Sequence, residues 1–307
     1  MNTLNTILVA VDFSTGSRAA LEQASRIARL QGARLHVLHV VDSSAVATLA
    51  ASRESSYESQ AAAAAHGAQT ALNSWLAQSH VPADVEATIA IGTPLHEILE
   101  HVRSLKADLL VAGIAGTGQT VSGAGSVSAK LARKSPSRVL LVRSNHPHAF
   151  KKVVACLDFS ETAKEVMASA RRIALKDSAS VDFLHVWQEP LVASPYGAAG
   201  DAWVGIGHPT VVFTPAERQT FIKGLHRELH DFVSAASQGI TATEVLRESL
   251  NYGNGIVAHA EEVNADLIIV GSKGRTNLRY VLLGSTAERL LTSLPCSVLV
   301  VKPAAQP

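Results

Sequence analysis

The sequence predicts an α/β protein of two tandem, doubly wound domains, and three observations lead to this prediction. Segments of the first half return in the same order in the second half, so that one domain of about 150 residues occurs twice. The strand candidates are continuous apolar runs, which is typical of parallel strands covered on both faces. Amphipathic helix candidates alternate with these runs, and right-handed crossovers then place helices on both faces of each sheet.

The repeat consists of four pairs of similar segments. They are 7–14 with 153–160, 35–41 with 183–187, 107–113 with 265–271, and 138–143 with 297–302. Solenoid repeats are only about 20–50 residues long, so the repeated unit here is a whole domain. We expect one domain at residues 1–145 and the other at residues 150–307, with Ser144 to Phe150 as the linker.

Five strand candidates alternate with four helix candidates in the first half. The strands are expected at 7–11, 35–41, 85–91, 109–112 and 138–142. The helices are expected at 18–30, 53–78, 95–105 and 126–134. The first helix has an apolar face, because five residues recur at helical spacing: Ala19, Ala20, Ala24, Ile27 and Ala28.

The second half follows the same order with one insertion, residues 188–213, which is rich in Gly, Pro and aromatic residues. A loop of this length in a compact domain is either functional or mobile. A helix is predicted to begin directly after it. Thr214, Pro215 and Glu217 combine an N-cap, a Pro at the first helical position and a capping-box Glu.

Composition and charge exclude several classes of function. The formal net charge is +1, whereas a nucleic-acid-binding surface would show a strong basic bias. The sequence shows no signal peptide and no apolar run of about 18 residues, so we expect a cytoplasmic protein without a membrane partner. Cys156 and Cys296 have no CxxC or metal-ligand spacing, and we expect buried, unreactive thiols.

A glycine-rich loop in the second half joins a strand to a helix. Its glycines are Gly271, Gly274 and Gly284, and the helix opens with Ser285 and Thr286. Glycine lets the backbone approach a phosphate closely, and a helix N-terminus offers free N–H donors and a positive dipole end to an anion. The loop therefore predicts a phosphate-binding site, with a tight structural turn as the alternative interpretation.

Charged residues near this loop fit the same prediction. Lys273, Arg275 and Arg279 supply positive charge for a phosphate. Asp158 ends the first strand of the second half, where a carboxylate can reach a ribose or an adenine. In doubly wound sheets the ligand crevice lies at the carboxyl ends of the strands, where the strand order reverses, so both groups are expected at one crevice.

The spaced motif resembles that of the universal stress protein family. Gly271, Gly274, Gly284 and Ser285 match G-x2-G-x9-G-(S/T) without a gap. The Asp after the first strand, the ADL run before the motif and the SVLVV strand after it also match, and the resemblance spans both halves apart from the insertion. It implies two Rossmann-like, adenine nucleotide α-hydrolase-like domains, each a five-stranded parallel sheet of order 3-2-1-4-5 with helices on both faces.

Some members of that family bind ATP through this loop and others do not. The resemblance implies that Asp158 contacts the adenosine and that Val186 lines the adenine pocket. It implies phosphate contacts from Gly271, Gly274, Gly284, Ser285 and Thr286. Lys273 and Arg275 would be auxiliary phosphate contacts, and the implied cofactor is ATP, with or without Mg.

The corresponding loop of the first half is altered. Its candidate site residues are Asp12, Val40, Gly113, Gly116, Gly125 and Ser126. The Gly125-Ser126 pair comes one residue earlier than the family spacing requires, and no Lys or Arg lies between Gly113 and Lys130. This half is expected to hold either a turn without a ligand or a weakened site. It keeps a G-x-P at 92–94, which the second half replaces by Leu-Asn-Tyr at 250–252.

Histidines and nucleophile motifs offer weaker alternatives. His226 and His230 lie one helical turn apart, but the Glu of a zincin motif is missing, so a solvated helix face is favoured and no metal is expected. His39 and His185 occupy equivalent strand positions and are expected to be structural, while His208 is a candidate by its position in the insertion alone. No G-x-S-x-G, Walker A or adenylation signature is present, so no catalytic residue is expected.

The first hypothesis is therefore a cytoplasmic universal stress protein that binds an adenine nucleotide in its second half and, as the resemblance implies, regulates survival under stress. The alternatives are an interaction scaffold of the same fold without a nucleotide, and a slow ATPase. The final strands, 139–142 and 298–301, are apolar, and a free edge strand needs to be covered. We therefore expect the two halves to pair within the chain, with a homodimer of whole chains also open.

Overall fold

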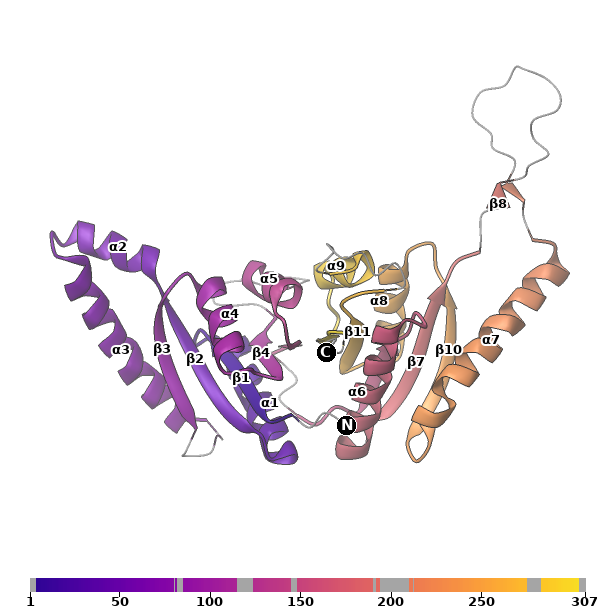
Figure 1. Cartoon of the computed structure of the whole chain (residues 1–307), viewed down its shortest axis with the longest axis horizontal. Helices are drawn as coiled ribbons and strands as arrows, with labels where there is room; N and C mark the ends of the chain where they lie inside the picture. Colours follow the sequence, from indigo (N-terminus) through magenta and orange to yellow (C-terminus); the bar gives the residue numbers. More distant parts are fainter. Residues whose placement is uncertain are drawn as a thin grey trace, which may run out of the picture.

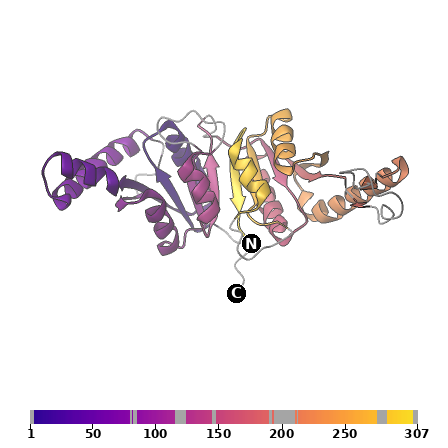
Figure 2. The same ribbon diagram turned by 90° about the horizontal axis from the view of Figure 1, so that it is seen from above.

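The strands of both halves join into one sheet. The computed structural model describes residues 4–79, 81, 85–114, 124–144, 148–189, 192–193, 210–211, 213–274 and 283–303. The first half contributes β1 (Thr6–Val11), β2 (Arg34–Asp42), β3 (Glu86–Gly92), β4 (Leu109–Gly113) and β5 (Arg138–Val142). The second half contributes β6 (Lys152–Cys156), β7 (Ser180–Trp187), β10 (Thr241–Glu248), β11 (Leu267–Gly271) and β12 (Ser297–Val301). The order across this ten-stranded sheet is β10-β7-β6-β11-β12-β5-β4-β1-β2-β3 (Figures 1 and 2).

Each half repeats the same topology. The spatial order is β3-β2-β1-β4-β5 in the first half and β10-β7-β6-β11-β12 in the second, so both follow the order 3-2-1-4-5. Neighbouring strands within a half are parallel. Helices cover both faces, which is why the central strands are apolar on both sides; every residue of β12, for example, is buried. The prediction of two doubly wound domains is confirmed.

The helices form a layer on each face of the sheet. Those of the first half are α1 (Thr15–Gln31), α2 (Ser43–Ser52), α3 (Tyr57–Ala77), α4 (Pro94–Ser104) and α5 (Ser126–Lys134). Those of the second half are α6 (Glu161–Asp177), α7 (Pro215–Ser237), α8 (Tyr252–Glu262) and α9 (Ser285–Thr292). Buried residues of α1, α3, α6 and α7 share one hydrophobic core, and those of α4, α5, α8 and α9 share the other. Both cores run through the two halves.

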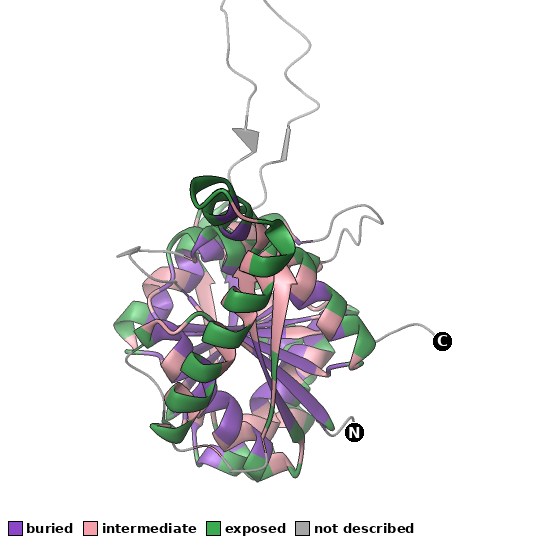
Figure 3. Cartoon of the chain, turned by 90° about the vertical axis from the view of Figure 1, so that its left-hand side faces the viewer, coloured by how far each residue is buried: buried purple, intermediate pink, exposed green. Residues whose placement is uncertain are grey.

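The outermost helices cover the ends of the sheet. α3 and α7 lie at opposite ends of the molecule (Figure 1). Figure 3 shows that α3 is largely exposed, while burial is concentrated in the sheet behind it. Leu72 is the buried residue of α3, so this helix is attached mainly along one narrow stripe. Among the described helices, none combines the length and apolar character that a membrane span requires.

The structure places α3 within the predicted helix over residues 53–78, and it adds α2 over residues 43–52, where no helix was predicted. The Asp42 side chain begins α2 by accepting a hydrogen bond from the Ser44 N–H at 2.8 Å. Hydrogen bonds from the Ser44 hydroxyl and N–H lower the pKa of Asp42. Ser56 begins α3 by accepting from the Ser59 N–H at 3.2 Å. No Gly or Pro lies between α2 and α3, so the end of α2 has no clear signal in the sequence.

The helix that follows the insertion begins where the sequence predicts it. Near the base of the insertion, β8 (Val192–Ala193) pairs with β9 (Thr210–Val211) in antiparallel fashion. α7 begins as predicted with Thr214 as N-cap and Pro215 in its first turn. The Glu217 carboxylate accepts from the Thr214 N–H at 2.8 Å, which completes the capping box. His208 lies outside the described residues.

The two halves meet where β5 pairs with β12 in antiparallel fashion. Leu140 lies opposite Leu299, and this pair is flanked by Val139 opposite Val300 and by Leu141 opposite Val298. Equivalent residues of the two repeats therefore exchange places across a pseudo-twofold axis at Leu140 and Leu299. Figure 2 shows these strands side by side at the centre of the molecule. The predicted pairing of the final strands is present in the structure.

Cations that follow these two strands reach the helix ends of the opposite half. The Arg143 guanidinium donates to the carbonyl of Leu294, just after α9. At the equivalent position, Lys302 Nζ donates to the carbonyl of Ala132 in the last turn of α5 at 2.8 Å. Carbonyl groups at helix C-termini lack helical partners and favour positive charge. Burial, together with the nearby charge of Lys273, lowers the pKa of Lys302 to about 8.

We predict that Leu140→Ala destabilises the chain. Leu140 is 2% exposed and lies opposite Leu299, so the truncation would remove buried apolar contacts where the two halves meet. The free energy of unfolding should fall by about 2–5 kcal/mol. Leu175→Ala is the matched control, because Leu175 is 53% exposed on α6. Denaturant unfolding checks the prediction, and equal stability of the two variants would contradict the described packing of the halves.

We predict a pH dependence of stability that arises from Lys302. Its pKa is about 8 when folded and 10.5 as its ordinary value, so the unfolded chain binds more protons between these two pH values. The contribution of Lys302 to the unfolding free energy should therefore rise as the pH increases from 8 to 10.5. Thermal unfolding of wild type and Lys302→Met across this range would measure it. A difference between the two proteins that is constant with pH would disprove the prediction.

Candidate functional site

A cavity of about 460 Å³ lies at the carboxyl ends of β6 and β11 in the second half. The strand order reverses here, because β6 pairs with β7 on one side and β11 on the other. The structure describes every predicted nucleotide-binding residue, and all line this cavity: Asp158, Val186, Gly271, Gly274, Gly284, Ser285 and Thr286. Lys273 lines it as well. Arg275 and Arg279 lie outside the described residues.

Asp158 lies in a turn that leads into α6. Its Oδ1 accepts hydrogen bonds from the Ser160 N–H at 3.1 Å and the Ser160 hydroxyl at 2.6 Å. Ser160 is also the N-cap of α6. Phe159 between them has a φ of 60°, a left-handed conformation that costs energy for a residue other than glycine. The turn thus holds the aspartate at the cavity at the expense of local strain.

Packing around Phe159 maintains this turn. Its ring packs on the His185 imidazole with centroids 4.4 Å apart. His185 Nδ1 lies 2.8 Å from the Leu157 carbonyl oxygen, and because that oxygen only accepts, Nδ1 carries the hydrogen. In the first half, Phe13 at a φ of 64° and His39 are arranged in the same way. Both histidines thus make the backbone contact expected of a structural residue, and His185 also lines the cavity.

The three glycines of the loop have different requirements. A Cβ at Gly274 would lie 2.8 Å from Asp158 Oδ2, and one at Gly271 would lie 2.9 Å from Thr162 Cγ2. These two positions need glycine for packing within the protein itself. At Gly284 the nearest atom would be 3.7 Å away, and its φ of −67° suits any residue. Packing therefore does not account for glycine at 284, where the missing side chain leaves open space.

The first turn of α9 opens into the cavity without a side-chain cap. Gly284 is the N-cap residue and offers no side chain. The backbone is fixed by a hydrogen bond from the Gly284 N–H to the Ser272 carbonyl at 2.8 Å. Uncapped N–H groups and the helix dipole favour an anion. With Lys273 beside it, this end of the cavity is suited to bind a negatively charged group.

Aromatic side chains that the sequence analysis did not select form another wall of the cavity. They are Trp187, Phe221 and Tyr252, and the rings of Trp187 and Phe221 meet edge to face at 5.6 Å. Comparison of the repeats contained a signal for Trp187, because the equivalent residue of the first half is Val41. The cavity therefore combines a polar, cationic end with an apolar, aromatic end.

The missing G-x-P of the second half does not disturb α8. Asn251 caps this helix by accepting a hydrogen bond from the Asn254 N–H at 3.0 Å. Tyr252 takes the place of the proline and lines the cavity. Gly255 in the first turn allows close packing, since a Cβ there would lie 2.8 Å from Val186. The helix N-terminus is thus formed by different residues at the equivalent place.

The first half has a smaller cavity of about 270 Å³ at the equivalent position. It is lined by the predicted residues Asp12, Val40, Gly113, Gly125 and Ser126, while Gly116 lies outside the described residues. No Lys or Arg is among the described residues that line it, in contrast to Lys273 in the second half. The two sites therefore share their frame and differ in charge and size.

The remaining candidates fit structural roles. His230 is exposed and pairs with Glu244 at 3.0 Å, and the described residues contain no group of three His, Cys, Asp or Glu suited to a metal. Cys296 is buried, and burial raises its pKa to about 12. Cys156 is partly exposed and lines the second-half cavity, with a thiol pKa that burial raises well above its ordinary value. Neither thiol is poised to ionise near neutral pH.

Comparison with known proteins agrees with this description. The model of the universal stress protein family matches residues 3–143 and 149–302. A universal stress protein of Methanocaldococcus jannaschii is 31% identical over 159 residues, covering 52% of this chain and 85% of that protein. YxiE, a universal stress protein of Bacillus subtilis, is 33% identical over 159 residues, covering 50% of this chain and 99% of that protein.

A solved structure extends the likeness to the whole chain. The crystal structure of a universal stress protein from Archaeoglobus fulgidus covers 99% of this chain and 100% of its own, with a TM-score of 0.66 and 19% identity. At this identity the match shows the shared fold. The chain therefore belongs to the universal stress protein family and carries two copies of the family domain in tandem.

Proposed function

We propose that the chain is a cytoplasmic regulator of stress survival that binds ATP, or another adenine nucleotide, in its second half. The observation that carries this proposal is the first turn of α9, which has no side-chain cap and opens into the cavity shared by Lys273 and Asp158. The cavity volume of about 460 Å³ falls within the range usual for small-molecule sites. The family domains are assigned to residues 1–145 and 150–307 as part of the proposal.

The phosphates would bind at the cationic end of the cavity. Gly284 leaves the space that a close approach of phosphate to backbone needs, and its neighbours Ser285 and Thr286 offer hydroxyl and N–H donors. Lys273 would offset part of the phosphate charge, with Arg275 as a further candidate from the same loop. Gly271 and Gly274 keep this loop close to α6 and Asp158.

The adenosine would bind at the other end, near Asp158 and Val186. Asp158 Oδ1 is engaged by Ser160, which fixes the carboxylate for recognition of hydroxyl or amino groups. Val186 and the aromatic wall supply apolar contacts for the base. Asp158 is the one carboxylate among the described residues that line the cavity.

The proposed role of the first half is mainly structural. Its cavity is smaller and has no cation among the described lining residues, so a triphosphate would lack charge compensation there. Its final strand pairs with β12 and thereby supports the nucleotide-binding half. A chain that binds no nucleotide in either half would instead be an interaction scaffold of the same fold.

We predict one adenine nucleotide per chain and a loss of affinity in Gly284→Ala. A methyl group at 284 meets no protein atom closer than 3.7 Å, so the fold should persist while the phosphate space is blocked. The dissociation constant for ATP should rise by about tenfold or more in calorimetric titration. Gly125→Ala, at the equivalent N-cap of α5, is the control and should leave affinity and stoichiometry unchanged. Equal effects of the two substitutions would refute the assignment to the second half.

We predict that any ATP hydrolysis is slow. Among the described lining residues, Asp158 is engaged by Ser160 and the Nδ1 of His185 is held by the Leu157 carbonyl, and no group of residues suited to a metal accompanies them. Turnover of the purified chain with Mg and ATP should stay below about 1 per second, the lower end of typical enzyme rates. A faster Mg-dependent turnover that disappears in Asp158→Asn would instead identify an enzyme.

A further inference from the structure

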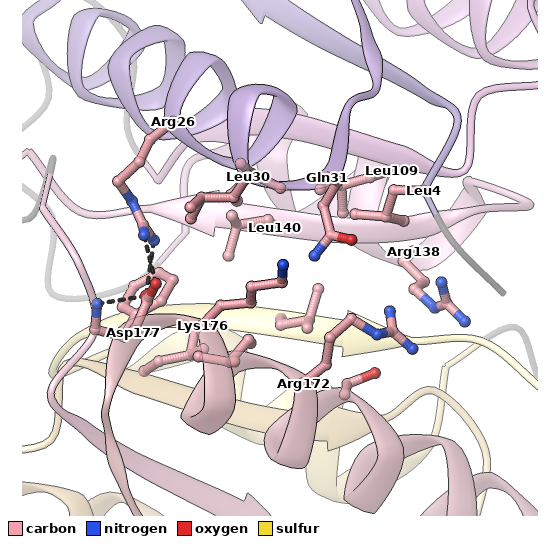
Figure 4. A pocket seen from close by; sticks show the side chains of 16 residues that line it. Leu4, Arg26, Leu30, Gln31, Leu109, Arg138, Leu140, Arg172, Lys176 and Asp177 are labelled. Atoms are coloured by element: carbon pink, nitrogen blue, oxygen red, sulfur yellow. Dashed lines mark hydrogen bonds and ion pairs between the residues drawn. The ribbon is translucent and has the colours of Figure 1, made fainter. Parts of the chain in front are cut away.

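A second cavity, remote from the proposed nucleotide site, lies between the two halves. It has a volume of about 70 Å³ and is bounded by α1 and α6 (Figure 4). Leu140 and Leu299, the pair on the pseudo-twofold axis, form part of its wall together with Leu109 and Leu267. Because it lies on this axis, equivalent residues of the two repeats approach it from opposite sides.

One side of this cavity holds a complete ion pair. Arg26 of α1 donates to both carboxylate oxygens of Asp177 at the end of α6, with distances of 2.6 and 2.9 Å. The Asp177 carboxylate also accepts from the Phe150 N–H at 2.9 Å. The side chain of Asp177 is 4% exposed, so this pair is shielded from water. A partly buried guanidinium is here matched by a buried carboxylate from the other half.

The symmetry-related pair is incomplete. α1 and α6 are each 17 residues long and share Arg-Ile-Ala, so Arg172 is the equivalent of Arg26 and Gln31 the equivalent of Asp177. In place of the carboxylate that would face Arg172, the cavity has the neutral amide of Gln31. Figure 4 shows Arg172 and Lys176 reaching from α6 into the space below this amide. Within the described part of the chain, neither cation forms a hydrogen bond or ion pair.

Two further features show that this side is short of an anion. Burial lowers the pKa of Arg172, and the nearby charge of Arg138 lowers it further. Glu165 offsets part of this effect. Glu165 is itself engaged by Arg138 at 3.2 Å. The hydroxyl of Ser169, a residue that is 3% exposed, also lines the cavity and has no hydrogen-bond partner among the described residues. An unpartnered buried hydroxyl is costly, so it indicates a missing acceptor.

We propose that this cavity binds a small carboxylate with a short apolar body. The carboxylate would take the place of the missing acidic side chain and meet Arg172, Lys176 and the Ser169 hydroxyl, as Asp177 meets Arg26. The leucine walls would contact the apolar body. An empty cavity of about 150 Å³ can hold benzene, which has six heavy atoms, so a volume of about 70 Å³ suits an acid of about three or four heavy atoms, such as acetate. Such a ligand would contact both halves and hold α1 against α6.

Acetate is the probe for this site, and the measurement is the thermal midpoint of the full chain, with calorimetric titration for affinity. Acetate should stabilise the wild type in a saturable way, whereas neutral acetamide and inorganic phosphate should have little effect. In Arg172→Gln the affinity for acetate should fall by about tenfold or more, since a charge-assisted hydrogen bond is lost. Lys164→Gln is the matched control, because Lys164 is an exposed cation of the same helix that lies outside the cavity lining.

Gln31→Glu tests the same idea from the opposite direction. It supplies a carboxylate from α1, so the variant should be more stable than the wild type without ligand and should no longer respond to acetate. Affinity for ATP should not change in either variant, which separates this proposal from that of the nucleotide site. Acetate and acetamide acting alike on the wild type would overturn the proposal. So would an unchanged acetate affinity in Arg172→Gln, or stabilisation by phosphate in place of acetate.

Discussion

The antiparallel pairing of β5 with β12 is the contact on which the rest of the molecule depends. It covers one edge of each five-stranded sheet with the other, so that neither apolar final strand is left unpaired. It also brings α1 close to α6 and places the ends of α5 and α9 within reach of Lys302 and Arg143. Because the halves are covalently linked, each meets the other at an effective concentration of about millimolar. The junction therefore forms within one chain and is independent of protein concentration.

This junction leaves each half free to diverge. The strained Asp-Phe-Ser turn and its histidine occur in both halves, so they belong to the shared frame and do not by themselves indicate a ligand. Glycine at 113 likewise serves packing, since a Cβ there would lie 2.8 Å from the backbone of Gly16. What differs is the charge beside the loop and the lining at Trp187. Those differences, and not the glycines as such, distinguish the proposed nucleotide site from its counterpart.

Sequence could predict the fold and the glycine-rich, polar side of the described site because both depend on local signals. Apolar runs predicted the strands, and the spaced glycines and Asp158 converge because the carboxyl ends of parallel strands share one edge. α2 was not predicted, because its start depends on Asp42 as the N-cap and no Gly or Pro marks its end. The wall formed by Phe221 and Trp187 was missed, since it depends on how α7, which packs on β10 and α6, brings Phe221 against Trp187. Contacts across the axis require the register of β5 with β12, which no local pattern specifies.

A tandem chain can carry different residues on the two sides of its pseudo-twofold axis, which a symmetric homodimer cannot. In a homodimer every residue near the twofold axis occurs twice, so a missing carboxylate on one side is missing on both. Here Asp177 and Gln31 differ although they are equivalent, and one guanidinium is neutralised within the protein while the other is not. The Arg26–Asp177 pair stabilises the contact between the halves without a ligand. The side with Arg172 and Gln31 would be stabilised when the proposed carboxylate binds. Duplication within one chain thus allows stability and ligand recognition to be divided between two halves of a single interface.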